Sequence, residues 1–161
     1  MNARRASIET LCANWPNSRM DEPTWLSRAM IEAAHHDQVQ EHGGLLGIRD
    51  DGLFESALAR PRHRWSFKPE TDPPSLAASY GFGLVKNHPF PDGNKRIGFV
   101  AMNMFLLING LEIEAPEPEV IAVMLQVADG NLDEPGLVDW LRSVVVPLLS
   151  DASPFLSADG V

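Results

Sequence analysis

Hydrophobic positions are most regularly spaced in the segment that follows residue 96. They recur three and four residues apart, which places them on one face of an α-helix: Ile97, Val100, Ala101, Met104, Phe105 and Ile108. Asn109-Gly110 comes next, a pair typical of a helix end. The pattern predicts a helix from Gly93 or Asn94 to about residue 108, and we expect it to be the central buried helix of the fold.

Weaker patterns of the same kind predict five more helices. They cover residues 24–42, capped by Thr24 and ended by Gly43-Gly44; Asp50 or Asp51 to Arg60, closed by Pro61; 74–87, opened by Pro73-Pro74; about Pro118 to Asp129; and about Asp133 to Val146. Residues 61–73 show no period, and we expect a short hairpin or flap at about 60–73. Because no alternation of strands and helices is visible, the sequence predicts an all-α fold with six helices.

The length of the chain, 161 residues, suits one domain with a sizeable core. We expect that domain over 23–148, with an N-terminal extension over 1–22 and a C-terminal tail over 149–161. No hydrophobic run is long enough to span a membrane, and the first residues lack the apolar core of a secretory signal. With Cys12 as its one cysteine, the sequence favours a cytoplasmic protein without membrane contact.

Charge is distributed unevenly along the chain. The formal net charge is -9, and Arg142 is the only lysine or arginine after Met102. So acidic a chain is a poor candidate for direct nucleic-acid binding, which requires neutralisation of phosphates. The bases gather instead in two stretches: Arg60, Arg62, Arg64 and Lys68, then Lys86, Lys95 and Arg96. We expect a local cationic pocket suited to a small anion.

Candidate chemistry lies in the loop that precedes the most regular helix. Pro89 and Pro91 prevent a helix from running through it, so the helix has to begin after them. The free N–H groups and the positive dipole end of a helix N-terminus favour anions. His88 is a candidate general base near neutral pH. Asp92 is a candidate Mg²⁺ ligand, since Mg²⁺ takes one or two carboxylates together with phosphate oxygens.

The remaining loop residues extend the same interpretation. Gly93 permits close approach of a ligand to the backbone, and Asn94 either caps the helix or offers its amide to an anion. Lys95 and Arg96 place positive charge where phosphoryl transfer needs it. Phe90 is most simply an anchor that packs the loop onto the core.

The pattern His88-x-Phe90-x-Asp92-Gly93-Asn94-Lys95-Arg96 resembles the signature of the Fic/Doc (Fido) superfamily, in its death-on-curing toxin form. Residues 43–50 and 52–61 are similar to the upstream region of that family, and His35 stands where the family often has a histidine in its first helix. The resemblance covers residues 24 to 146. It implies a Fido fold with a nucleotide bound at the loop and at the N-terminus of the following helix.

The resemblance also implies roles for single residues. His88 would deprotonate a protein hydroxyl and Asp92 would hold Mg²⁺. The nucleotide phosphates would be bound by Gly93, Asn94, Lys95 and Arg96, with Lys86 as a further base before the motif. The stretch 60–68 would be a flap that holds the target peptide through Arg62, Arg64 and Trp65.

The transferred group is open between two chemistries. AMP-transferring relatives resemble a pattern with glycine at position 95 and arginine at position 99, where this chain has Lys95 and Phe99. Both departures match the death-on-curing branch, which implies a kinase that passes the γ-phosphate of ATP to elongation factor Tu and arrests translation. An AMP transferase and a non-catalytic binding module with the same fold are the alternatives.

An antitoxin partner is implied as well. A Ser/Thr-x-x-x-Glu-(Gly/Asn) pattern, the mark of an inhibitory helix in related chains, is absent from residues 1–30. We therefore expect the antitoxin to be a separate chain.

Overall fold

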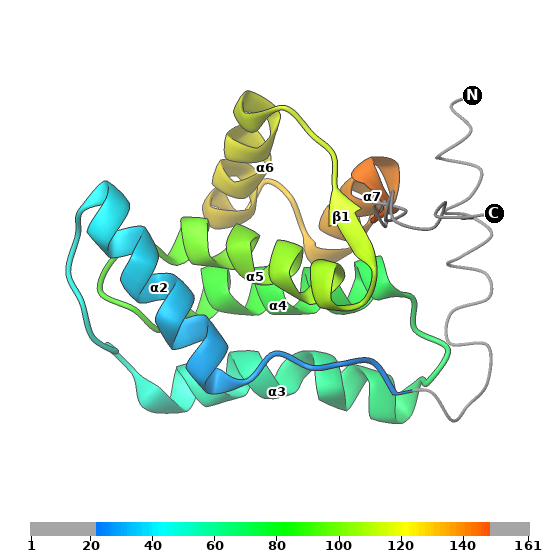
Figure 1. The fold of residues 1–161 in the computed structure, drawn as a ribbon, viewed down its shortest axis with the longest axis horizontal. Helices are drawn as coiled ribbons and strands as arrows, with labels where there is room; N and C mark the ends of the chain where they lie inside the picture. Colours follow the sequence, from blue (N-terminus) through cyan, green and yellow to red (C-terminus); the bar gives the residue numbers. More distant parts are fainter. Residues whose placement is uncertain (1–21, 149–161) are drawn as a thin grey trace, which may run out of the picture.

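The computed structural model describes residues 22–148, and helices account for most of them (Figure 1). The elements in chain order are α2 (Arg28–His42), α3 (Asp51–Phe67), α4 (Pro73–Asn87), α5 (Asn94–Ile108), β1 (Leu111–Ile113), α6 (Glu117–Asp129), α7 (Glu134–Val144) and β2 (Val145–Pro147). This confirms an all-α fold with six helices in the described range. Residues 1–21 of the predicted N-terminal extension (1–22) and the whole predicted C-terminal tail (149–161) lie outside the described residues.

The centre of the fold is α4 rather than α5, which corrects the expectation from periodicity. Twelve of the 15 residues of α4 are buried, against seven in α5. The reason is that α4 packs against α3, α5 and α7 on different sides, so no polar face remains to give a period. Small residues bring α4 and α5 close together: a Cβ on Gly98 would lie 3.1 Å from the carbonyl oxygen of Gly81.

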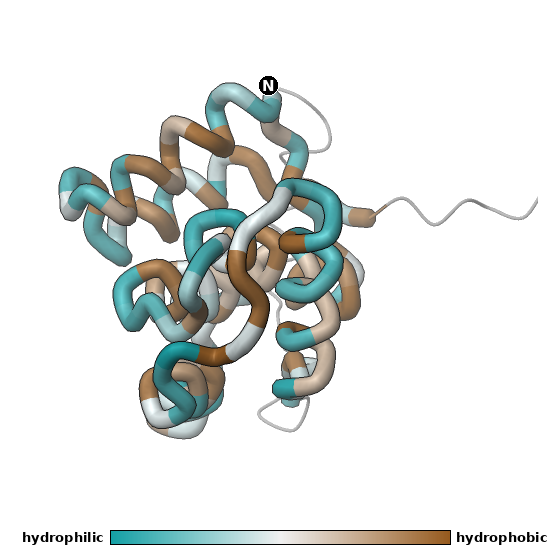
Figure 2. Tube along the Cα trace, turned by 90° about the vertical axis from the view of Figure 1, so that its left-hand side faces the viewer, coloured by the Kyte–Doolittle hydropathy of each residue, from teal (hydrophilic) through white to brown (hydrophobic). Residues whose placement is uncertain are grey.

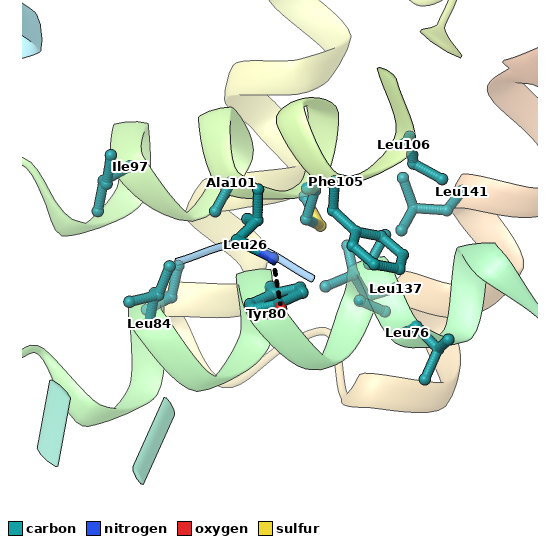
Figure 3. Packing of buried hydrophobic residues seen from close by; sticks show 14 of the residues in the cluster. Leu26, Leu76, Tyr80, Leu84, Ile97, Ala101, Phe105, Leu106, Leu137 and Leu141 are labelled. Atoms are coloured by element: carbon teal, nitrogen blue, oxygen red, sulfur yellow. Dashed lines mark hydrogen bonds between the residues drawn. The ribbon is translucent and has the colours of Figure 1, made fainter. Parts of the chain in front are cut away.

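Figure 3 shows how the core between these helices is filled. Side chains of α4, α5 and α7 interdigitate: Leu76, Tyr80 and Leu84, then Ile97, Ala101 and Phe105, then Leu137 and Leu141. The Tyr80 hydroxyl accepts a hydrogen bond from the N–H of Leu26 at 3.1 Å. Burial raises the pKa of Tyr80 to about 12.

The predicted end of α3 and the predicted start of α2 were wrong. α3 does not close at Pro61 but runs on to Phe67, so residues 60–67 are helical and form no hairpin. Pro61 falls on the buried face with Phe54 and Ala57, and this burial offsets the loss of one backbone hydrogen bond. α2 starts at Arg28, later than predicted, because the Ser27 side chain accepts a hydrogen bond from the third residue beyond it.

The small sheet was missed from the sequence. β1 and β2 pair antiparallel, with Leu111 opposite Pro147 and Ile113 opposite Val145. Three residues are too few to show a strand period, so Val145 and Val146 were predicted as the end of a helix. In the part of the chain that the structure describes, no helix is long and apolar enough to cross a membrane.

Candidate active site

The loop from His88 to Gly93 joins α4 to α5 and has a left-handed residue at each end. His88 ends α4 with φ 49° and ψ 53°, and its side chain is exposed. Gly93 precedes α5 with φ 79°, and no side chain caps the helix there. The first N–H groups of α5 therefore keep the unsatisfied donors and positive dipole end that favour an anion.

Phe90 fixes the middle of the loop to the core. Its side chain is 1% exposed. The ring stacks on His35 at 3.9 Å between centroids and 11° between planes, and it lies 5.1 Å from Phe54. His35 is itself buried, and its Nε2 donates a hydrogen bond to the carbonyl oxygen of Asp92 at 2.8 Å. Helix α2 thus contacts the loop at two points, Phe90 and Asp92, through the side chain of His35.

Asn94 closes the loop on itself. Its Oδ1 accepts a hydrogen bond from the N–H of Phe90 at 3.0 Å, and its Nδ2 donates to the Phe90 carbonyl at 2.9 Å. The side chain is 4% exposed. Its amide is therefore bonded to the backbone of Phe90 and does not cap α5. The uncapped backbone N–H groups at the start of α5 are the donors that we expect to form an anion hole.

The connection between α2 and α3 lies over Asp92. The carboxylate accepts a hydrogen bond from the N–H of Leu45 at 2.9 Å. A Cβ on Gly44 would lie 3.1 Å from that of Asp92, so glycine permits this approach. Leu45 and Leu46 are 65% and 51% exposed. Figure 2, which faces this end of the molecule, shows the connection crossing the front as a hydrophobic stretch between hydrophilic ends.

Arg49, at the end of the same connection, holds the start of the loop. Its Nε donates to the carbonyl of His88 at 2.7 Å, and its Nη2 donates to that of Asn87 at 3.1 Å. The backbone N–H groups of Arg49 and Asp50 both donate to the carbonyl of Pro89, at 2.7 and 3.1 Å. Sequence reasoning gave Arg49 no role, and its place in the upstream motif was the signal that could have found it.

A cavity of about 650 Å³ lies beside the first turns of α5. Residues of α2, α5 and α6, with Ala115 before α6, line it: Gln38, His42, Lys95, Arg96, Phe99, Val100, Ala115, Glu117, Val120, Ile121, Met124 and Leu125. The two cations stand at the α5 side and aliphatic side chains of α6 form the other wall. Such a lining suits a ligand with an anionic end and an apolar body.

Comparison with known proteins identifies the loop. A family model described as the Fic/DOC family matches residues 25–106, half of the chain, including the whole loop. This chain belongs to the Fic/DOC family. It is 29% identical over 117 residues to the protein named Protein kinase doc of Escherichia phage P1, covering 73% of this chain and 92% of that protein. It is 39% identical over 75 residues to the protein named Toxin Doc of Mycolicibacterium smegmatis, covering 45% and 57%.

In this Fic/DOC chain, the two positions that depart from the AMP-transferring pattern share one surface. Lys95 and Phe99 are one helical turn apart on α5, and both line the cavity. A glycine at position 95 would leave open the space that the lysine fills, and an arginine at position 99 would add a positive charge that the Phe99 ring lacks. Both departures therefore change the lining of one cavity.

The predicted flap residues do not reach the loop. Arg64 Nη1 pairs with Glu134 of α7 at 3.0 Å. The Arg62 guanidinium lies 5.7 Å from the Trp25 ring, and Trp65 meets Trp25 edge to face. The loop contacts the first turn of α3, whereas these residues lie three turns further along, about 16 Å at 1.5 Å per residue. The flap prediction was wrong because the stretch continues a helix.

The bases of the predicted cationic pocket lie in two separate places. Arg60 and Arg64 both pair with Glu134 at the far end of α3, while Lys95 and Arg96 line the cavity beside α5. The two arginines share one carboxylate within the fold, whereas Lys95 and Arg96 stand at the cavity with the α5 N-terminus.

Lys86 lies against the Phe82 ring, which Arg60 also approaches. Its Nζ stands beside Gly130 at the end of α6, 3.8 Å from where a Cβ would be, and 5.7 Å from the Phe82 ring. It is not among the residues that line the cavity. The negative dipole end at the C-terminus of α6 favours a cation at this place.

Proposed function

We propose that this chain is a Doc-like toxin that transfers the γ-phosphate of ATP to a hydroxyl group of a protein. The observation that carries the proposal is the uncapped N-terminus of α5. The loop with His88 and Asp92 comes directly before it, and Lys95 and Arg96 of its first turn line the cavity. The name of one relative, Protein kinase doc, supports the reaction class, and the name of the other, Toxin Doc, supports the role as a toxin.

The cavity has the size and lining for a nucleotide. Its volume of about 650 Å³ lies within the range of small-molecule sites. The triphosphate would extend from the cavity along Lys95 and Arg96 to the N–H groups of α5. These fixed donors would stabilise the negative charge on the transferred phosphoryl group without reorganisation.

His88 is the proposed general base. It is exposed at the surface, where a hydroxyl of another protein can reach it, and its backbone is held by Arg49. The imidazole would take the hydroxyl proton as the hydroxyl oxygen forms a bond to the γ-phosphorus. The bond from that phosphorus to the bridging oxygen breaks, and ADP leaves with the electron pair.

Asp92 is the proposed protein ligand of a Mg²⁺ ion that is bound to ATP. Residues 22–148 contain no group of three or more histidines, cysteines or acids that could hold a metal by themselves. Mg²⁺ is commonly bound through one carboxylate and the phosphates of its nucleotide, so the single carboxylate agrees with a metal that arrives with ATP. Such a metal would neutralise charge on the phosphates.

The test follows the label of the nucleotide. The purified protein is incubated with Mg²⁺ and either γ-labelled or α-labelled ATP, together with elongation factor Tu, the proposed substrate. We expect label only from the γ-position, its loss in His88→Ala, and its retention in His63→Ala, which removes an exposed histidine at the far end of α3. Label from the α-position alone would reject the kinase in favour of AMP transfer.

A binding module without catalysis predicts transfer from neither position. It also predicts that His88→Ala stays as toxic as the wild-type chain when it is expressed in the cytoplasm without the antitoxin. A separate antitoxin chain is part of the proposal, and co-expression with it should restore growth.

A further inference from the structure

His88 has an unfavourable backbone conformation. Within residues 22–148 it is the only residue other than glycine with a positive φ. The left-handed region costs an ordinary residue free energy because Cβ approaches the following carbonyl. The next residue is Pro89, and a residue before proline is driven toward extended backbone instead. Both preferences oppose the observed conformation, so contacts from elsewhere in the fold have to maintain it.

Those contacts come from Arg49. Three successive carbonyl oxygens, of Asn87, His88 and Pro89, accept hydrogen bonds from the Arg49 side chain and from the backbone of Arg49 and Asp50. The two side-chain bonds use the planar fork of the guanidinium, which a lysine lacks. The positive charge also stands at the C-terminus of α4, where the helix dipole favours a cation.

We propose that Arg49 is a positioning residue, which holds His88 in the left-handed conformation from which its imidazole meets the substrate. This inference rests on the proposed function for its effect on the reaction, but not for its effect on the backbone. Arg49 does not line the cavity. Its loss should therefore lower kcat and leave the KM for ATP almost unchanged.

The backbone effect is measured without any assay of activity. Glycine adopts positive φ without strain, so His88→Gly should raise the midpoint of thermal unfolding by about 3 °C when Arg49 is present. In Arg49→Ala, residue 88 is free to relax, so the same substitution should raise the midpoint by less than about 1 °C. An equal gain in both backgrounds would overturn the proposal.

A matched control is available at the opposite end of the same helix. Arg142 donates to Asp72, the N-cap of α4, at 2.9 Å, so Arg142→Ala removes a comparable tie from the N-terminus. In that background the gain from His88→Gly should persist in full. Its disappearance there too would show a general loosening of α4, and the proposal would be wrong.

The kinetic measurement uses phosphate transfer by the full chain. Arg49→Ala should lower kcat about 10- to 100-fold, since a misplaced catalytic group loses that much, with the KM for ATP within about twofold. Arg49→Lys should recover part of the loss and Arg142→Ala should stay within twofold of wild type. A kcat unchanged in Arg49→Ala would refute the role. If the wild-type chain transfers no phosphate, the proposed function fails, and the thermal comparison alone decides the positioning.

Discussion

Replacing Asn94 by alanine tests whether this side chain serves the loop or a ligand. The substitution removes two hydrogen bonds, 3.0 and 2.9 Å long, to the N–H and carbonyl of Phe90. Each such bond contributes about 1 kcal/mol net, and a buried group left without a partner costs about 1 to 3 kcal/mol. Alanine returns about 0.5 kcal/mol through its higher helix propensity. The free energy of unfolding should fall by about 2 to 4 kcal/mol.

Urea unfolding followed by circular dichroism measures this loss. With a slope of about 2 kcal/mol per molar for a domain of this size, the midpoint should fall by about 1 to 2 M. Asn103→Ala is the control on the same helix, since its Oδ1 accepts one long bond of 3.5 Å from the N–H of Ile113. Its midpoint should fall by less than about 0.5 M.

The opposite pattern would refute this account of Asn94. A variant that unfolds like Asn103→Ala but no longer binds ATP would show that the amide faces the nucleotide. The anion hole would then include this side chain.

Three further predictions concern the framework around the site. Tyr80 is the sole tyrosine of the chain, so ultraviolet titration reports it alone, and we expect a pKa of about 12 in the folded protein and about 10 in urea. The contribution of this shift to the free energy of unfolding should be complete below pH 10 and lost as the pH rises toward 12. An ordinary pKa in the folded protein would contradict the burial of Tyr80. Gly98→Ala should lower stability by about 1 to 3 kcal/mol in thermal unfolding, because the new Cβ would lie 2.7 Å from Val85; a neutral effect would mean that α4 and α5 separate freely. Glu134→Ala should lower stability by about 1 to 3 kcal/mol in urea, since two arginines lose their partner; no loss would show that the pairs are only superficial.

The loop and the helix after it could be predicted from the sequence, because local chemistry decides both. Pro89 and Pro91 exclude a helix, Gly93 allows the turn, and α5 shows its period because one of its faces is only partly buried. α4 gave a weaker pattern for the opposite reason, since neighbours surround it. The end of α3 was predicted wrongly because a proline usually ends a helix, whereas the buried Pro61 stays within α3.

The supports of the site could not be predicted, since they depend on distant residues. Nothing near Asn94 in the sequence shows that its amide turns back to Phe90 rather than outward. The contact of Arg49 with His88 spans 39 residues, and that of His35 with Asp92 spans 57. Only the docking of α2 and α3 against the loop brings these groups together.

Those long spans have a consequence for how the site is lost. The core between α4 and α5 does not depend on the α2–α3 connection, but the shape of the loop does. If α2 and this connection open locally, His88 and Asp92 lose their supports while most of the protein remains folded. Hydrogen exchange would then reveal a folded but inactive chain, in which the first region to open is the one that shapes the site.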